Sequence, residues 1–145
     1  MKLEHDSKIC DLPDGYTPSE DEEFMNDYQR EYFRNKLIAW KKELSKDNEE
    51  VVKYLQEEGK NCTDVADRAA SETDLAYELR SKERARKLIR KIDEALIRIK
   101  SGTYGYCEET GEPISLKRLE ARPVAMLSIE AQERHEKQER IQKDD

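Results

Sequence analysis

Two long stretches of this chain each carry a single narrow apolar stripe, and this pair of stripes constrains the fold more than any other feature. The first stripe consists of Phe33, Leu37, Trp40, Leu44, Val51 and Leu55. The second consists of Leu75, Leu79, Ala85, Leu88, Ile92, Leu96 and Ile99. Intervals of three and four residues are typical of one face of an α-helix. We therefore expect two long helices, each with only one face suited to packing.

The residues between the stripes predict a helical hairpin. Gly59 and Asn61 are typical helix terminators, and Ser101–Gly102 closes the second stripe. Adjacent helices of similar length joined by a short turn usually pair antiparallel. We expect a coiled-coil hairpin over residues 26–101 with its tip at about 60–71. Because each helix has one apolar seam, the pair must project into solvent or into a partner.

The segments flanking the hairpin differ in character. Residues 1–31 hold ten acidic and three basic residues with Pro13, Gly15 and Pro18 among them, so residues 1–25 are predicted to be a mobile acidic leader. Ser19 with Glu22, and Asn26 with Gln29, have the spacing of a helix capping box. Residues 102–127 are predicted to form a small α+β module. It would contain a two-stranded ribbon around Thr110–Gly111 and a short helix over 116–121. Residues 128–145 are predicted to form a final helix, starting at Ser128, and a tail.

Composition excludes several classes of protein. The 145 residues are 42% charged and 35% hydrophobic, with a mean hydropathy of -1.09, which favours an elongated helical protein over a thick globular core. No apolar run approaches the ~18 residues of a membrane span, and the first residues lack the apolar region of a signal peptide. Three dispersed cysteines do not suggest a disulfide framework. We expect a cytoplasmic protein.

The charge distribution favours a protein partner over DNA. A net charge of -7 disfavours autonomous binding to nucleic acid. The stretch 80–100 nevertheless holds nine basic and three acidic residues. A solvated helix face is the simplest interpretation of this stretch, and a basic contact surface is the alternative.

The C-terminal module carries an incomplete metal motif. Cys107, Thr110, Ser128 and Ala131 have the spacing of a four-cysteine zinc site, but only one of them is a cysteine. One thiolate cannot complete a tetrahedral site, so stable zinc is not expected. Packing of apolar residues such as Tyr104, Ile114 and Leu119 must then replace the metal.

Several motifs together resemble the DksA/TraR family of transcription factors, between about residues 22 and 137. They are Glu23-Phe24-Met25-Asn26, Tyr32-Phe33, Ala39-Trp40, Asp64-x-x-Asp67-Arg68-Ala69-Ala70, Glu78-Leu79-Arg80, Arg86-Lys87-Leu88-Ile89, Tyr104-Gly105-Tyr106-Cys107 and Arg118-Leu119-Glu120-Ala121-Arg122-Pro123. Zinc-binding relatives keep four cysteines in the finger, so this chain resembles a cysteine-poor branch of the family.

The resemblance implies a function on RNA polymerase. Members of the family bind the polymerase rather than DNA, insert the coiled coil through its secondary channel and destabilise open promoter complexes. The resemblance places the working tip at Asp64, Asp67 and Ala69. A purely structural alternative is that Asp67 caps the second helix.

The resemblance also implies the alarmone ppGpp as a co-regulator at the polymerase interface. The matching positions for ppGpp binding are Leu88, Lys91, Arg122 and Gln132, where well-known relatives carry a lysine in place of Gln132. Lys and Arg suit a pyrophosphate through charge-assisted hydrogen bonds. Arg84 and Lys87 are candidates for contacting the polymerase rim.

Two other functional classes fit the sequence less well. A structural coiled-coil adaptor explains the helices but not the C-terminal module, and it would dimerise, whereas the polymerase interpretation expects a monomer. An enzyme is not expected, because the two histidines, His5 and His135, lie in flanking segments and no phosphate-binding loop or nucleophile and base pair is visible. A redox role for Cys107 stays open.

Overall fold

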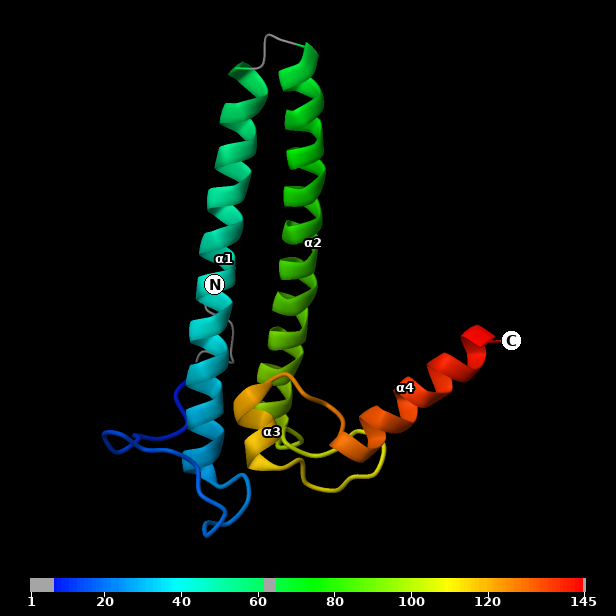
Figure 1. Cartoon of the computed structure of the whole chain (residues 1–145). Helices are drawn as coiled ribbons and strands as arrows, with labels where there is room; N and C mark the ends of the chain where they lie inside the picture. The colour runs from blue at the N-terminus through cyan, green and yellow to red at the C-terminus, as the bar shows by residue number, and fades with distance from the viewer. Residues whose placement is uncertain (1–6, 62–64, 145) are drawn as a thin grey trace. The chain divides into compact units, whose positions relative to one another are not determined.

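The chain is built almost entirely from helices. The computed structural model describes residues 7–61 and 65–144. Within these ranges it contains α1 (Asp27–Asn61), α2 (Val65–Ser101), α3 (Leu116–Ala121) and α4 (Ile129–Asp144), as Figure 1 shows. The chain divides into two compact units, Met1–Leu37 with Glu94–Asp145, and Ile38–Asp93. Both α1 and α2 contribute residues to each unit, and the predicted mostly helical class is confirmed.

Local hydrogen bonds set the start of α1. The Asn26 side chain accepts a hydrogen bond from the Gln29 backbone N–H at 2.9 Å, and the Gln29 side chain accepts one from the Met25 N–H at 2.8 Å. This reciprocal pair is a capping box whose return bond is displaced by one residue. The buried Gln29 also donates from Nε2 to the Ser19 carbonyl at 3.2 Å. The helix therefore begins at the residue after Asn26, and it continues through Gly59 to Asn61.

The two long helices pair antiparallel. In the unit Ile38–Asp93, Lys41 Nζ on α1 lies 2.7 Å from Asp93 Oδ1 on α2. In the other unit, Arg30 Nη2 donates to the Ile99 carbonyl at 2.5 Å. Residues that lie later in α1 thus contact residues that lie earlier in α2, and Figure 1 shows the two helices side by side. The coiled-coil hairpin predicted from the two stripes is confirmed.

The seam on α2 follows a heptad register rather than the positions of the leucines. Steps of three and four residues back from Ile99 lead through Leu96, Ile92, Ile89, Ala85, Lys82 and Glu78 to Leu75. These positions are buried or half-buried, except that Leu75 is 38% exposed. Leu79 lies outside this register and is 50% exposed, so its assignment to the seam was wrong. Glu78 is half-buried instead, as expected where a 3.5-residue period decides which side chains face the partner helix.

We call Met1–Leu37 with Glu94–Asp145 the larger unit. Its buried core connects the two long helices to the C-terminal module. Phe33 and Leu37 on α1 and Leu96 and Ile99 on α2 are buried. The ring of Tyr104 lies 5.7 Å from that of Phe33, and the Tyr104 hydroxyl donates to the Pro123 carbonyl at 2.7 Å. This burial raises the pKa of Tyr104. The hydroxyl of Tyr104 thus donates to the loop after α3, while its ring packs on the helices.

The C-terminal module differs from its prediction in one respect. α3 has the bounds predicted for it, and Ser115 caps it by accepting from the Arg118 N–H at 3.2 Å. The expected ribbon around Thr110–Gly111, however, is reduced to an isolated antiparallel bridge between Tyr106 and Pro113. Proline has no N–H to donate, so a ladder through Pro113 cannot extend.

The N-terminal segment 7–26 makes defined contacts within the larger unit. Tyr16 donates from its hydroxyl to Glu22 Oε2 at 2.5 Å, and Phe24 meets Tyr106 edge-on at 5.4 Å. Gly105 has a φ of 89°, and a Cβ there would lie 3.0 Å from Met25 Cγ.

Among the described helices, none combines the length and the apolar character needed to cross a bilayer.

Candidate functional site

The four positions of the incomplete metal motif lie in one loop and helix start. Cys107 is 2% exposed, and Ser128 and Ala131 are also buried, whereas Thr110 is exposed. The turn is held by the Gly111 N–H, which donates to the Cys107 carbonyl at 2.8 Å, and the Glu108 N–H, which donates to the Met126 carbonyl at 2.8 Å. Ser128 caps α4 by accepting from the Ala131 N–H at 3.3 Å. These hydrogen bonds hold the loop that carries Cys107 and Thr110 and begin α4 at the residue after Ser128.

Hydrogen bonds stabilise the thiolate form of Cys107. Burial by itself raises the pKa of the thiol, but the Thr110 hydroxyl and the Ser128 backbone N–H donate to the sulfur. Further hydrogen bonds from the Thr110 N–H and the Ser128 hydroxyl act in the same direction, and together they lower the pKa to about 6. The two hydroxyl residues thus occupy ligand positions as hydrogen-bond donors to sulfur.

The residues present do not fit a structural zinc ion. A tetrahedral site needs four nitrogen or sulfur ligands, while these positions offer one thiolate, two hydroxyls and a methyl group. Nowhere in the described ranges do three His, Cys, Asp or Glu side chains cluster in a way that could hold a metal. His135 lies 2.5 Å from Glu109 Oε1, so its imidazole is engaged with that carboxylate. The module is held together by packing and hydrogen bonds.

The predicted tip falls largely outside the described part of the chain. Asp64 belongs to residues 62–64, which lie outside the described ranges. Asp67 and Ala69 lie in the first turns of α2, and their side chains are not described. The tip assignment accordingly stays a prediction.

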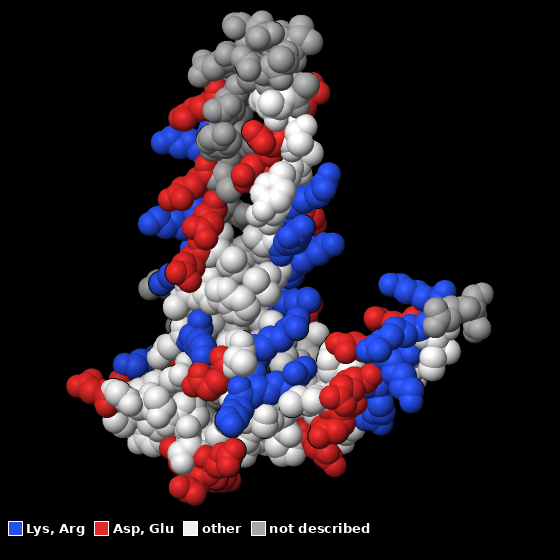
Figure 2. Space-filling view, viewed as in Figure 1, with Lys and Arg blue, Asp and Glu red and all other residues white. Residues whose placement is uncertain are grey.

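Basic side chains follow one face of α2. Arg84, Lys87 and Lys91 are exposed and Leu88 is half-buried, and their spacing of three, four and seven residues places them on one helix face. Figure 2 shows Lys and Arg side chains along the visible side of α2. The predicted rim residues and two of the predicted alarmone residues therefore share a surface in the unit Ile38–Asp93.

The other two predicted alarmone residues belong to the larger unit. Arg122 is exposed at the C-terminal end of α3, where its backbone N–H donates to the Arg118 carbonyl at 2.7 Å. Gln132 is half-buried on the first turn of α4, and its amide donates to Glu136 Oε1 at 3.3 Å. Arg122 thus lies at the end of α3, and Gln132 lies in the first turn of α4.

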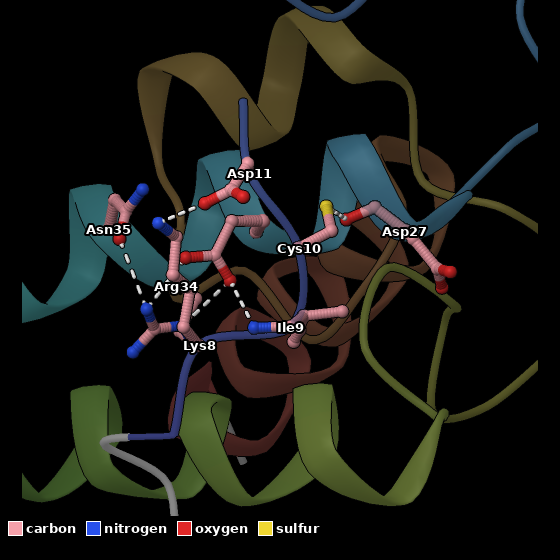
Figure 3. A network of polar contacts seen from close by, with 8 residues as sticks. Lys8, Ile9, Cys10, Asp11, Asp27, Arg34 and Asn35 are labelled. Atoms are coloured by element: carbon pink, nitrogen blue, oxygen red, sulfur yellow. Dashed lines mark hydrogen bonds and ion pairs between the residues drawn. The ribbon is translucent and has the colours of Figure 1, made fainter. Parts of the chain in front are cut away.

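Sequence reasoning missed a buried ion pair beneath the N-terminal segment. Glu31 and Arg34 on α1 are 1% and 8% exposed. Arg34 donates from Nε to Glu31 Oε2 at 2.9 Å and from Nη2 to Oε1 at 2.6 Å, and the Ile9 N–H donates to Oε2 at 2.8 Å. Burial raises the pKa of Glu31, but the hydrogen bonds from Arg34 and Ile9 outweigh it and hold the pKa below its ordinary value. Through the hydrogen bond from Ile9, the pair ties this segment to α1, and Figure 3 shows Ile9 close to Arg34.

A second missed cluster joins α1 to α3. Lys36 Nζ lies 2.5 Å from Glu120 Oε2 and donates to the Glu120 carbonyl at 2.8 Å. The Tyr32 hydroxyl also donates to the Glu120 carboxylate. Burial raises the pKa of Tyr32 to about 12, and the hydrogen bond to Glu120 adds to this. In the sequence, the one indication of this contact between α1 and α3 is that Glu120 lies within the family motif Arg118–Pro123.

Comparison with known proteins identifies relatives along nearly the whole chain. Residues 29–99 match the model for "DnaK suppressor protein DksA, N-terminal domain", and residues 102–137 match "Prokaryotic dksA/traR C4-type zinc finger". An RNA polymerase-binding transcription factor DksA of Caulobacter vibrioides is 63% identical over 130 residues, which are 90% of this chain and 92% of that protein.

More distant relatives agree with this assignment. The protein of the same name from Escherichia coli K12 is 42% identical over 115 residues, covering 79% of this chain and 76% of that protein. The solved structure of transcription factor DksA2 from Pseudomonas aeruginosa aligns with a TM-score of 0.75 at 45% identity. That alignment covers 81% of this chain and 90% of the other.

Proposed function

The chain belongs to the DksA/TraR family, and from that premise we propose that it binds bacterial RNA polymerase and regulates transcription. The high identity with the Caulobacter vibrioides relative, whose name states polymerase binding, carries the proposal. The net charge of -7 supports a protein partner in place of DNA. Nothing in the comparisons favours the structural adaptor over this function.

We propose that the hairpin tip acts inside the secondary channel of the polymerase. A pair of helices, each about 10–12 Å across with its side chains, is narrow enough to enter a pore. Small residues such as Ala69 keep its end thin, and the carboxylates of Asp64 and Asp67 can meet basic side chains or alter the surroundings of a catalytic magnesium ion. The tip would then shorten the lifetime of open promoter complexes while residues nearer the finger supply affinity.

Basic residues on α2 are proposed to contact the partner and the alarmone. Arg84 and Lys87 would contact the polymerase rim, and Leu88 and Lys91 on the same face would contact ppGpp with Arg122 and Gln132. Exposure of Arg84, Lys87 and Lys91 supports these roles, because a contact surface must be accessible. Gln132 lacks the cation that relatives provide there, which would weaken the pyrophosphate contact.

The protein is proposed to work without a metal, as a monomer in the cytoplasm. The Cys107 site supports metal independence, because its two hydroxyl residues donate hydrogen bonds to the sulfur in place of ligands. The monomer follows from the proposed mechanism, since a channel admits one hairpin.

Retention of purified polymerase on the immobilised chain tests the proposal. We expect stoichiometric retention from purified core enzyme in buffer without DNA. Arg84→Ala combined with Lys87→Ala should weaken retention about tenfold, because two charge-assisted contacts are lost. Lys117→Ala is the control, because Lys117 is an exposed cation on α3 and is not one of the proposed contact residues. Failure of the unmodified chain to retain polymerase would contradict the proposal.

A further inference from the structure

Tyr77 on α2 differs from every other tyrosine whose side chain the structure describes. Each of the others either donates a hydrogen bond from its hydroxyl or packs its ring against a second aromatic ring. These residues are Tyr16, Tyr28, Tyr32, Tyr104 and Tyr106. Tyr77 is 66% exposed, and within the described part of the chain it has neither a hydrogen-bond partner nor a ring contact. The fold therefore gains little from this ring.

Tyr77 continues the basic face of α2. Steps of three and four residues lead from Tyr77 through Arg80, Arg84 and Lys87 to Lys91, and all five side chains are exposed. Residues at these spacings lie on one side of a helix, so the ring and the four cations share one surface in the unit Ile38–Asp93. Among the described residues, none forms an ion pair with these four cations. The surface is therefore open to a partner.

The residue types on this surface are those of a binding interface. Ala, Lys, Glu and Gln all have higher helix propensity than Tyr, so an exposed ring in the middle of a helix does not favour the helix itself. Single exposed apolar residues are ordinary on protein surfaces. Tyr77, however, stands three residues from Arg80 and seven from Arg84 on one helix face. Tyr and Arg, together with Trp, are the residues that most often dominate the energy of an interface.

We propose that Tyr77 anchors the chain in an apolar pocket of RNA polymerase whose rim carries carboxylates. The ring fills the pocket and its hydroxyl donates to an acceptor there, because a buried tyrosine hydroxyl needs a partner. Arg80 and Arg84 pair with the rim carboxylates through charge-assisted hydrogen bonds. The inference rests on the proposed function, because the family assignment supplies polymerase as the partner.

The anchor adds a contact at a new place along the hairpin. Tyr77 follows Asp67 by ten residues and precedes Arg84 by seven. At 1.5 Å per residue these separations are about 15 Å and about 10 Å along α2. The ring thus lies between the proposed tip residues and the proposed rim contacts, and it supplies the apolar contact that both of those groups lack.

Competition binding to purified core polymerase tests the anchor, with unlabelled variants displacing a labelled original chain. Tyr77→Ala should weaken binding at least about thirtyfold, as expected of a residue that dominates an interface. Tyr77→Phe keeps the ring, so its loss should not exceed about tenfold, the effect of one hydrogen bond. Thermal melts should match that of the original chain, because alanine is the better helix former and Tyr77 makes no described hydrogen bond.

Leu79→Ala is the matched control. Leu79 is 50% exposed on the same helix, but residues two apart in a helix do not face each other, so it lies on a different side from Tyr77. Its substitution should leave the affinity within about twofold of the original value. Hydroxyl-radical footprinting gives a second measurement without any substitution. Oxidation of Tyr77 should fall severalfold when the original chain binds core polymerase.

Several results would overturn the inference while polymerase binding stands. These are Tyr77→Ala competing as well as the original chain, Leu79→Ala losing as much affinity as Tyr77→Ala, and unchanged oxidation of Tyr77 in the complex. Dimers in sedimentation equilibrium that Tyr77→Ala dissociates would assign the ring to a second copy of this chain instead. Failure of the original chain to bind core polymerase would overturn the proposed function itself, and the anchor with it.

Discussion

The buried pair of Glu31 and Arg34 permits a quantitative prediction about the N-terminal segment. Arg34→Met removes both guanidinium hydrogen bonds to a carboxylate that is 1% exposed, and the methionine keeps most of the packing volume. Removing one partner of a buried pair leaves an uncompensated charge and costs about 3–5 kcal/mol. We expect urea denaturation at pH 7 to report a loss of this size.

A double-mutant cycle at Glu31 and Arg34 provides the control. Glu31→Gln with Arg34→Met leaves no buried charge at the pair, so its cost should be clearly smaller than the sum of the two single variants. An Arg34→Met protein that stays within about 1 kcal/mol of the original chain would refute the buried ion pair. A double variant whose loss of unfolding free energy equals the sum of the two single losses would refute the energetic coupling of Glu31 and Arg34.

At acid pH, the difference in stability between the original chain and the Arg34→Met variant should become smaller. The hydrogen bonds from Arg34 and Ile9 hold the pKa of Glu31 below its ordinary value of 4.5, so the stability it contributes is present above that pH and is lost as pH falls through the lower folded pKa. Without Arg34, the carboxyl loses its largest stabilising hydrogen-bond contribution while burial remains, so its pKa rises. The two denaturation midpoints should therefore converge at acid pH, and a gap that widens below pH 4.5 would contradict this linkage.

Five further predictions concern residues between Gly105 and Gln132. Elemental analysis should find far less than one zinc per chain, and chelators should leave the circular dichroism spectrum unchanged, since no further metal ligands cluster with Cys107 among the residues that the structure describes. Alkylation of Cys107 should increase with pH around its pKa of about 6, and a midpoint near 9 would be contrary evidence. Ser128→Ala should cost about 1 kcal/mol of unfolding free energy through loss of the α4 cap, whereas an unchanged urea midpoint would exclude that role. Gly105→Ala should cost about 1–2 kcal/mol because φ is 89° and the new Cβ meets Met25, and a neutral thermal melt would argue against it. Gln132→Lys should increase the response to ppGpp in a transcription assay by restoring a cation, and an unchanged response would place this position outside the nucleotide site.

Features fixed by neighbouring residues were predictable from the sequence. α3 and the start of α1 follow from capping residues within a few positions of the helix ends, so their bounds could be derived from local pattern. Leu79 was assigned wrongly because its hydrophobicity drew it into the stripe, while the heptad register brings Glu78 to the seam.

Features built from distant segments were not predictable. The acidic composition of residues 1–25 predicts mobility, yet the Ile9 N–H is bound by Glu31. Likewise Lys36 and Glu120 pair across 84 positions, and no periodicity in either segment indicates that contact.

The proposed role of the hairpin tip is tested most directly by the half-life of open promoter complexes on purified RNA polymerase. Asp67→Asn keeps the size of a side chain that lies in the first turn of α2, and it removes the charge. At concentrations giving equal polymerase occupancy, the unmodified chain should shorten the half-life, and chains carrying Asp67→Asn with Asp64→Asn should lose most of that effect. An undiminished effect with both carboxylates neutralised would contradict the proposed mechanism.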